Sequence, residues 1–128
     1  MADTDATVIE SDPGFVKSVQ PVLDLYWPLP TVSELKVPSR PDMTTYAAGY
    51  NALYHICTNF DHDASAKLVM PPLEETVKLW VTAARAYVEA GPDDTRLERY
   101  LATWETFKKC NDYTKRMYIY PDRSVWFL

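Results

Sequence analysis

The sequence predicts an all-α protein, a helical bundle of four to five helices, from three observations. Apolar residues recur three and four positions apart along most of the chain, which is the period of helices with one buried face. Ten prolines and only three glycines separate these periodic stretches. No stretch alternates apolar and polar residues for long enough to predict a strand. The 128 residues suit one domain, which we expect at 13–128 behind a disordered acidic leader at 1–12.

The first helix is expected over residues 15–27, where four apolar side chains keep the helical period. They are Val19, Val22, Leu23 and Tyr26. Pro21 interrupts this stretch, so the helix is expected either to kink there or to begin there. Four prolines between Pro28 and Pro41 exclude regular structure and predict an extended connector.

The second helix is expected from the cap residue Asp42 to about residue 60. Nine of its residues fall within an arc of about 180° on a helical wheel. They are Met43, Tyr46, Ala47, Tyr50, Leu53, Tyr54, Ile56, Cys57 and Phe60. One neighbouring helix needs an apolar stripe only a little over about 100° wide. The part of the arc beyond this width is covered either by another helix of the same bundle or by a partner protein. The helical wheel alone does not decide between these two alternatives.

The third helix is expected to begin at Pro71 and Pro72, because proline fits the first turn of a helix, after a turn at residues 61–65. Gly91, followed by proline, is expected to end it. The apolar face of this helix consists of Leu73, Val77, Trp80, Val81, Ala84 and Val88.

The last helix is expected to start at Thr95-x-x-Glu98, which has the pattern of a capping box. It continues for about 26 residues until Pro121, longer than most globular helices. Its periodic apolar residues are Leu97, Tyr100, Leu101, Trp104, Phe107, Tyr113, Met117 and Tyr120. Because they sit in apolar stripes, Trp80 and Trp104 are both expected in the core.

Residues 50–59, Tyr-Asn-Ala-Leu-Tyr-His-Ile-Cys-Thr-Asn, resemble the pattern Tyr-x-x-hydrophobic-Tyr-x-x-Cys-Thr on the second helix of the first cullin repeat. Cullins are the scaffold subunits of multisubunit ubiquitin ligases. The final region resembles the run of aromatic and basic residues at the end of that repeat. The matching residues are Leu97, Tyr100, Trp104, Phe107, Tyr120 and Arg123. Residues 15–26 also fit the first helix of the family, so the resemblance covers about 13–126.

The resemblance implies a bundle of five α-helices whose second and last helices hold a BTB-fold adaptor. The second-helix pattern resembles the cullins that bind Skp-type adaptors. The residues around Asp93 and Trp104 resemble the branch that binds elongin-type adaptors, so both types remain open. The contact residues it implies are Tyr46, Ala47, Tyr50, Leu53 and Tyr54 from the second helix, with Met117 and Tyr120 from the last. The resemblance therefore favours docking over a purely structural role for the tyrosines.

Two departures from the family bear on this face. Pro121 stands where the family has a leucine inside a helix, so the last helix is expected to stop early or bend. Gly49 stands where a larger residue is common and would leave a shallow gap in the face. The domain that recruits the RING subunit in cullins has no counterpart in these residues. The chain is therefore expected to act as a competitor for the adaptor or to be the tip of a longer scaffold.

Composition argues against several other functions. A net charge of −5 disfavours nucleic acid and anionic membranes as partners, although Lys108, Lys109, Lys115, Arg116 and Arg123 make the last helix locally basic. With no signal peptide and no apolar run long enough to span a bilayer, the chain is expected in the cytoplasm or nucleus. Cys57 and Cys110 are expected to be buried, inert thiols.

No group of residues predicts catalysis, a metal site or a cofactor. His55 and Cys57 point about 160° apart on a helix and cannot share a metal. Neither cysteine has a recognisable base, and three isolated glycines build no phosphate loop. The sequence thus predicts a non-catalytic binding module. The alternative is a helical module that forms a homodimer or binds an unrelated peptide.

Overall fold

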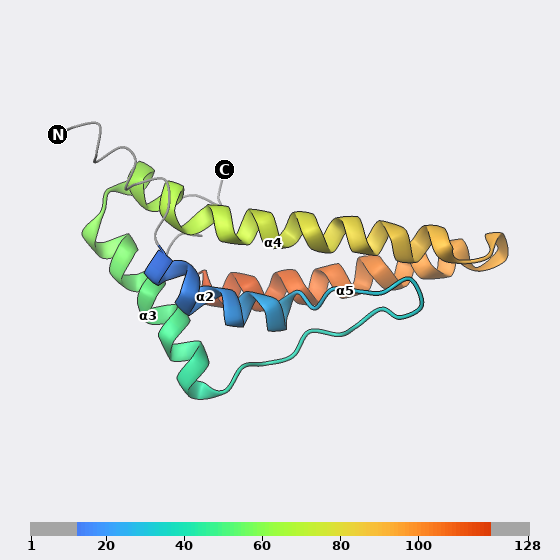
Figure 1. The fold of residues 1–128 in the computed structure, drawn as a ribbon, viewed down its shortest axis with the longest axis horizontal. Coiled ribbons are helices and arrows are strands. Elements are labelled where there is room, and N and C mark those ends of the chain that lie inside the picture. The colour runs from blue at the N-terminus through green and yellow to red at the C-terminus, as the bar shows by residue number, and fades with distance from the viewer. Residues whose placement is uncertain (1–12, 119–128) are drawn as a thin grey trace.

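The computed structural model describes residues 13–118, which form four α-helices and one short 3-10 turn (Figure 1). The elements are α2 (Pro13–Tyr26), α3 (Met43–Asn59), α4 (His62–Ala90), the 3-10 turn η1 (Asp93–Thr95) and α5 (Arg96–Met117). These residues contain no strand. The predicted all-α helical bundle is confirmed.

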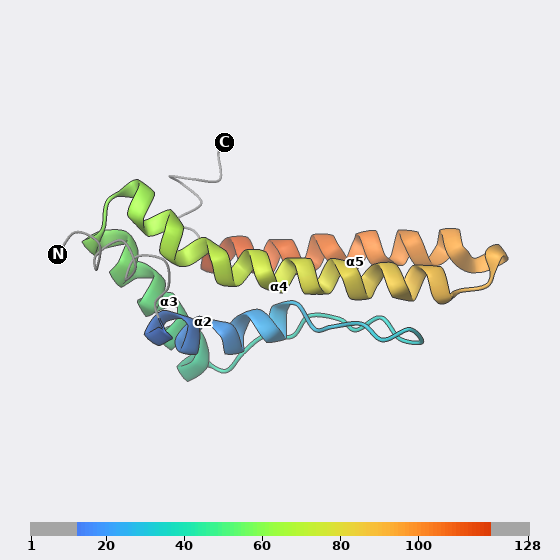
Figure 2. The ribbon, with the colours of Figure 1, turned by 45° about the horizontal axis from the view of Figure 1, so that its top comes forward.

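The two longest helices, α4 and α5, run antiparallel and side by side as a hairpin (Figures 1 and 2). α3 lies at the end of this hairpin where α4 begins and α5 finishes. α2 and the connector of residues 27–42 lie along one side of the hairpin, and the connector reaches toward the hairpin tip before it returns to α3 (Figure 2). The opposite side of the hairpin has no described segment over it.

The core is centred on three aromatic rings, from α4, from α5 and from the residue that follows α2. Trp27 meets Trp80 edge-on at a centroid distance of 5.6 Å and Phe107 at 5.5 Å, in the arrangement that aromatic pairs prefer. Trp80 is 1% exposed, so its predicted place in the core is confirmed. At the end of α5, Tyr118 donates a hydrogen bond from its buried hydroxyl to the carbonyl oxygen of Val69 at 3.1 Å, which fixes the two helices to each other.

α2 passes through Pro21 without ending. It runs from Pro13 to Tyr26, so the expectation that it begins at Pro21 is wrong. The proline ring is exposed, and the buried positions of the helix lie on another face. They are Phe15, Val19, Val22, Leu23 and Tyr26. Burial of this face outweighs the one backbone hydrogen bond that the proline cannot make.

α4 begins nine residues before the predicted start at Pro71, and the predicted turn at 61–65 is mostly helix. Asp61 caps the helix by accepting a hydrogen bond from the Ala64 N–H at 2.9 Å. Leu68 and Val69 of the early turns are buried. Pro71 and Pro72 lie inside the helix and cannot donate to the carbonyls four residues earlier. Figure 2 shows the first turns of α4 running at an angle to the rest.

The tip of the hairpin forms differently from the predicted capping box. Gly91 ends α4 as expected, but Thr95 makes no side-chain cap with the start of α5. Its hydroxyl instead donates to the carbonyl of Pro92 at 3.1 Å. Arg99 crosses the tip, and a Cβ at Gly91 would lie only 2.6 Å from its Cδ.

Arg99 links the hairpin tip to the connector. Its guanidinium donates to the backbone oxygens of Tyr87 at 2.7 Å and Val32 at 2.9 Å. The same group lies 4.4 Å from the centroid of the Tyr87 ring, a cation–π distance. One side chain thus joins α4, α5 and the connector.

α5 ends at Met117, earlier than its predicted end near Pro121, which lies outside the described residues. The expected core position of Trp104 is wrong, because this side chain is 50% exposed. Leu97, Tyr100 and Leu101 on the same face are also exposed. The helical period is present, but no element within residues 13–118 covers this part of the hairpin.

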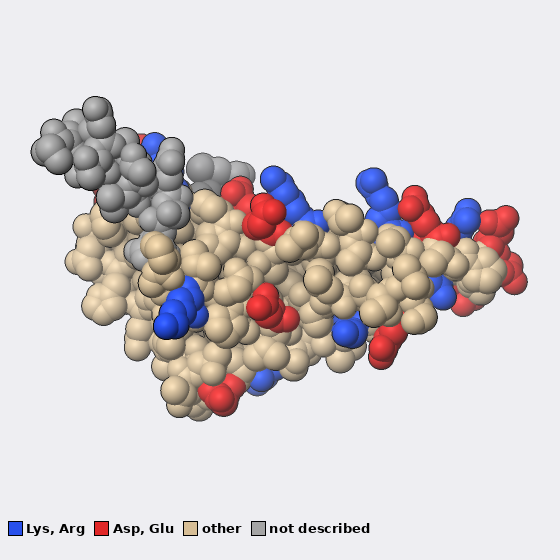
Figure 3. Space-filling model, in the orientation of Figure 1, with Lys and Arg blue, Asp and Glu red and all other residues tan. Residues whose placement is uncertain are grey.

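Acidic and basic side chains alternate along α4 and at the hairpin tip, and most of the remaining surface of this face is uncharged (Figure 3). No basic patch of the kind that binds nucleic-acid phosphates forms on this face. Among the described residues, no helix is both long and apolar enough to cross a membrane.

Candidate partner-binding face

α3 is held against α2 by its glycine. A Cβ on Gly49 would lie 3.2 Å from Val22 Cγ2 and 3.3 Å from the Ser18 carbonyl oxygen, closer than most side chains pack. The predicted gap in an exposed face is therefore wrong: Gly49 is buried and lets the two helix backbones approach. Leu53 and Ile56 complete the buried side of α3.

The tyrosines of α3 lie beside this buried side and form a ridge that we call the tyrosine face, defined by Tyr46, Ala47, Tyr50 and Tyr54. Tyr46 and Tyr50 are half-buried, and their rings stack at 6.1 Å with an interplanar angle of 16°. Ala47 is exposed, and Tyr54 is 42% exposed with its ring edge-on to His55 at 6.3 Å. Neighbouring helices therefore leave part of the ridge accessible.

Two of the predicted contact residues belong to the core. Leu53 and Met117 are each 1% exposed, and the Met117 sulfur lies 3.5 Å from the position of a Cβ on Gly49. Their side chains are therefore not available to a partner in this fold, and their assignment to the contact face is corrected. Tyr120 lies outside the described residues.

The start of α3 and the end of α5 meet at a hollow of about 230 Å³. The hollow is lined by Tyr26, Arg40, Pro41, Met43, Tyr46, Tyr113 and Arg116. The Tyr113 ring stacks on Tyr26 at 5.3 Å, and the guanidinium carbons of Arg40 and Arg116 lie 5.6 Å and 5.9 Å from its centroid. The second and last predicted helices thus share one continuous surface next to the tyrosine face.

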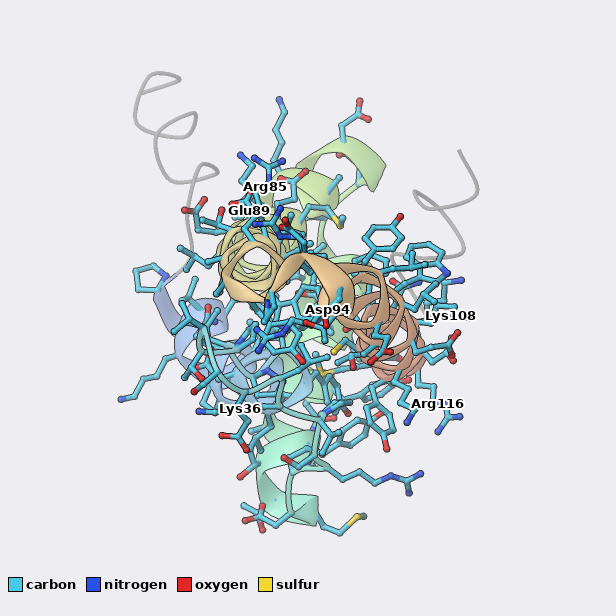
Figure 4. All side chains as sticks on the ribbon, turned by 90° about the vertical axis from the view of Figure 1, so that its right-hand side faces the viewer. Lys36, Arg85, Glu89, Asp94, Lys108 and Arg116 are labelled. Atoms are coloured by element: carbon cyan, nitrogen blue, oxygen red, sulfur yellow. The ribbon has the colours of Figure 1, made fainter. Side chains whose placement is uncertain are left out.

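Burial raises the pKa of Tyr26 to about 12, and Tyr46 adds to the rise while Arg40 opposes it. The Tyr26 hydroxyl is therefore neutral at physiological pH. Arg40 and Arg116 give the hollow a positive edge, and Arg116 points outward from α5 (Figure 4). A positive edge next to aromatic rings suits an acidic protein surface.

Sequence reasoning missed Arg40, Met43 and Tyr113 as members of this surface. Met43 is 82% exposed, whereas the helical wheel places it only in the apolar arc. Arg116 follows Tyr113 by three residues, a spacing that places both on the same side of a helix. The contribution of Arg40 could not be found in this way, because it depends on the path of the connector.

Both cysteines among the described residues are free thiols. Burial raises the pKa of the half-buried Cys57 and raises that of the buried Cys110 to about 12, so both remain in the unreactive thiol form. In residues 13–118, no three His, Cys, Asp or Glu side chains are grouped closely enough to hold a metal ion.

No protein-family model, curated protein or solved structure matches the chain.

Proposed function

We propose that the chain is a non-catalytic module that binds a BTB-fold adaptor through the tyrosine face, as its resemblance to the first cullin repeat implies. One observation carries this proposal. Tyr46 and Tyr50 stack half-buried on α3, beside the exposed Ala47 and Tyr54. The ridge is thus ordered by the fold and still open to a partner.

An ordered aromatic ridge suits protein binding for two physical reasons. A tyrosine buries a large ring area and can leave its hydroxyl in water, so it tolerates both the free and the bound state. Stacking of Tyr46 on Tyr50 also limits their motion before binding, which lowers the entropy lost when a partner docks. Ala47 leaves room in which a partner side chain can approach the helix.

The hollow between α3 and α5 extends the surface toward the size of a protein interface, which is roughly 800 Å² per partner. Arg40 and Arg116 at its edge favour an acidic adaptor surface. Attraction of this kind speeds association and weakens with salt. Either a Skp-type or an elongin-type adaptor is compatible with this chemistry.

Two roles follow from adaptor binding without catalysis. Alone, the module would occupy the adaptor and compete with a complete ligase scaffold. Joined to further scaffold domains, it would serve as the adaptor-binding tip. Both roles would be exercised in the cytoplasm or nucleus, and neither requires a cofactor.

The proposal is tested by titrating purified Skp-type and elongin-type adaptors into the chain by calorimetry. Tyr50→Ala combined with Tyr54→Ala is expected to weaken binding by roughly 2–4 kcal/mol if the tyrosines are hot spots. Tyr100→Ala is a matched control, because Tyr100 is an exposed tyrosine on α5. Helicity by circular dichroism shows whether each variant is folded.

Two results would contradict the proposal. One is an adaptor affinity that the double substitution leaves unchanged. The other is a tight homodimer in sedimentation that binds neither adaptor, which supports the self-associating alternative.

A further inference from the structure

A long apolar groove follows the seam between α4 and α5. Two hollows of about 420 Å³ and 410 Å³ lie one after the other along it and share Phe107. The α4 side of the groove is lined at steps of three and four residues by Met70, Leu73, Val77, Val81, Ala84 and Val88. This spacing puts them on one face of α4, so the two hollows lie end to end on the same side of the hairpin.

The length of the groove matches a helix. From Met70 to Val88 a straight helix rises about 27 Å, or five turns. Val81 and Trp104 on its walls are exposed, and the exposed Leu97 and Leu101 extend the apolar surface along α5. Contiguous apolar surfaces of this kind mark sites of protein contact.

The groove opens away from the rest of the fold. Figure 4 shows Arg85 and Glu89 pointing away from α2 and the connector, with Lys108 on the outer side of α5. Arg85 and Glu89 both line the groove. A third helix laid along it would therefore meet no described segment.

Two buried polar atoms at the groove have no hydrogen-bond partner among the described residues. They are the indole Nε1 of Trp80 and the hydroxyl of Thr103, and both residues line the first hollow. Such atoms are rare in folded proteins.

The rim of the groove on α4 carries four charges in a symmetric order. Glu74 and Glu89 lie near its ends, and Lys78 and Arg85 lie between them. None of the four forms an ion pair with another described residue. Along this α4 rim, two positive side chains therefore stand between two negative ones.

We propose that this groove binds an amphipathic helix of about five turns from another protein. The apolar stripe of that helix lies in the groove, acidic side chains at its middle face Lys78 and Arg85, and basic side chains near its ends face Glu74 and Glu89. The site is separate from the tyrosine face, so it adds a second surface to the proposed function.

The charge order disfavours a second copy of the chain that pairs in the centred register. If two copies of α4 paired antiparallel about a two-fold axis in the centre of the groove, Glu74 of one copy would face Glu89 of the other. Lys78 would likewise face Arg85, because both pairs have the same midpoint. Like charges would then meet at four positions.

The test uses two synthetic 20-residue helical peptides with the same apolar stripe. One carries glutamates at its middle and lysines at its ends, and the other has these charges exchanged. Binding is measured by fluorescence anisotropy, and the indole N–H signals of Trp80 and Trp104 report occupancy of the groove by NMR. We expect the peptide with the acidic middle to bind about tenfold more tightly than the other.

Lys78→Glu combined with Arg85→Glu should reverse this preference, since both side chains are exposed and can change charge without loss of fold. Lys17→Glu combined with Lys36→Glu changes the net charge equally at exposed sites elsewhere and should leave the preference intact. Val81→Glu should weaken both peptides. Tyr50→Ala with Tyr54→Ala should weaken neither, which separates this groove from the tyrosine face.

Three results would overturn the inference. The first is equal binding of the two peptides, and the second is an equal effect of the control charge changes. The third is a chain that sediments as a dimer until Val81→Glu is introduced, because the groove would then be an interface between copies.

Discussion

The indole N–H of Trp27 donates a 2.8 Å hydrogen bond to the hydroxyl oxygen of Thr114 inside the core. Trp27 follows the last turn of α2, and Thr114 lies in the last turns of α5. The Thr114 hydroxyl in turn donates to the carbonyl oxygen of Cys110 at 2.9 Å. This chain of two bonds links segments 87 residues apart and satisfies an indole that would otherwise be buried without a partner.

Replacing Thr114 by valine keeps the size of the side chain but leaves the Trp27 N–H without its acceptor. We expect the free energy of unfolding to fall by about 1–3 kcal/mol, measured by urea denaturation. Thr106→Val is the control, because Thr106 is also buried but its hydroxyl bonds only to the carbonyl oxygen of Ala102. Equal losses in the two variants would show that the indole bond contributes nothing beyond a helical threonine bond.

Gly49→Leu should separate α2 from α3, because the position of a Cβ on Gly49 is already within 3.3 Å of the Ser18 carbonyl oxygen. We expect a loss of roughly 1–3 kcal/mol in the free energy of unfolding. Ala48→Leu introduces the same side chain at the exposed neighbouring position and should change stability little. A stable Gly49→Leu protein would mean that the two helices are not in close contact.

Leu53→Ala and Tyr54→Ala should separate the core of α3 from its proposed binding surface. Leu53 is fully buried, so its truncation should cost about 2–5 kcal/mol of stability. Tyr54 is partly exposed, so Tyr54→Ala should cost much less stability and should weaken adaptor binding. Urea denaturation and calorimetry against the same adaptor measure the two effects. If Tyr54→Ala instead unfolds the protein, the tyrosine is part of the core.

Stability should fall at alkaline pH. Burial raises the pKa of Cys110 from 9.0 to about 12 and that of Tyr26 from 10.0 to about 12. Both groups keep their protons in the folded chain and lose them more easily when it unfolds. Their contribution is complete below about pH 9 and is lost progressively as the pH rises to about 12. Urea midpoints at about pH 8 and about pH 10.5 measure the decline.

Cys110→Ala is the informative variant for this pH dependence. It lowers stability at neutral pH because it removes a buried side chain, but it should also make the decline above pH 9 shallower. A slope identical to that of the unchanged protein would contradict the role of the thiol.

Local patterns predicted those parts of the fold that depend on local chemistry. Asp42 accepts a hydrogen bond from the Thr45 N–H at 2.7 Å and caps α3 as its position before the helix indicates. That bond also holds the pKa of Asp42 below its ordinary value. Gly91 ends α4 as expected. In both cases the deciding interaction lies within a few residues of the signal.

The errors share one cause, which is that periodicity shows a helix but not what packs against it. Gly49 has no side chain and so adds nothing to the apolar arc of a helical wheel. Its small size nevertheless lets this side of α3 pack closely against α2. Leu53 belongs to the same apolar arc as the tyrosines but lies on its buried edge. Trp104 keeps the period of α5 on a face that no described helix covers. Pro71 and Pro72 have the local pattern of a helix start, but the helix continues before them. The burial of Leu68 and Val69 stabilises those earlier turns, and this tertiary contact has no local signal.

Arg99 has a consequence for how the molecule opens. Its guanidinium holds the backbone of Tyr87 and of Val32 at once, so the connector cannot lift away while the end of α4 stays in place without breaking one of these bonds. We therefore expect amide hydrogen exchange in the two segments to rise together when Arg99 is replaced. A lysine at this position has no planar guanidinium to lie over the Tyr87 ring, so it would hold the shared donor less firmly between the two carbonyls.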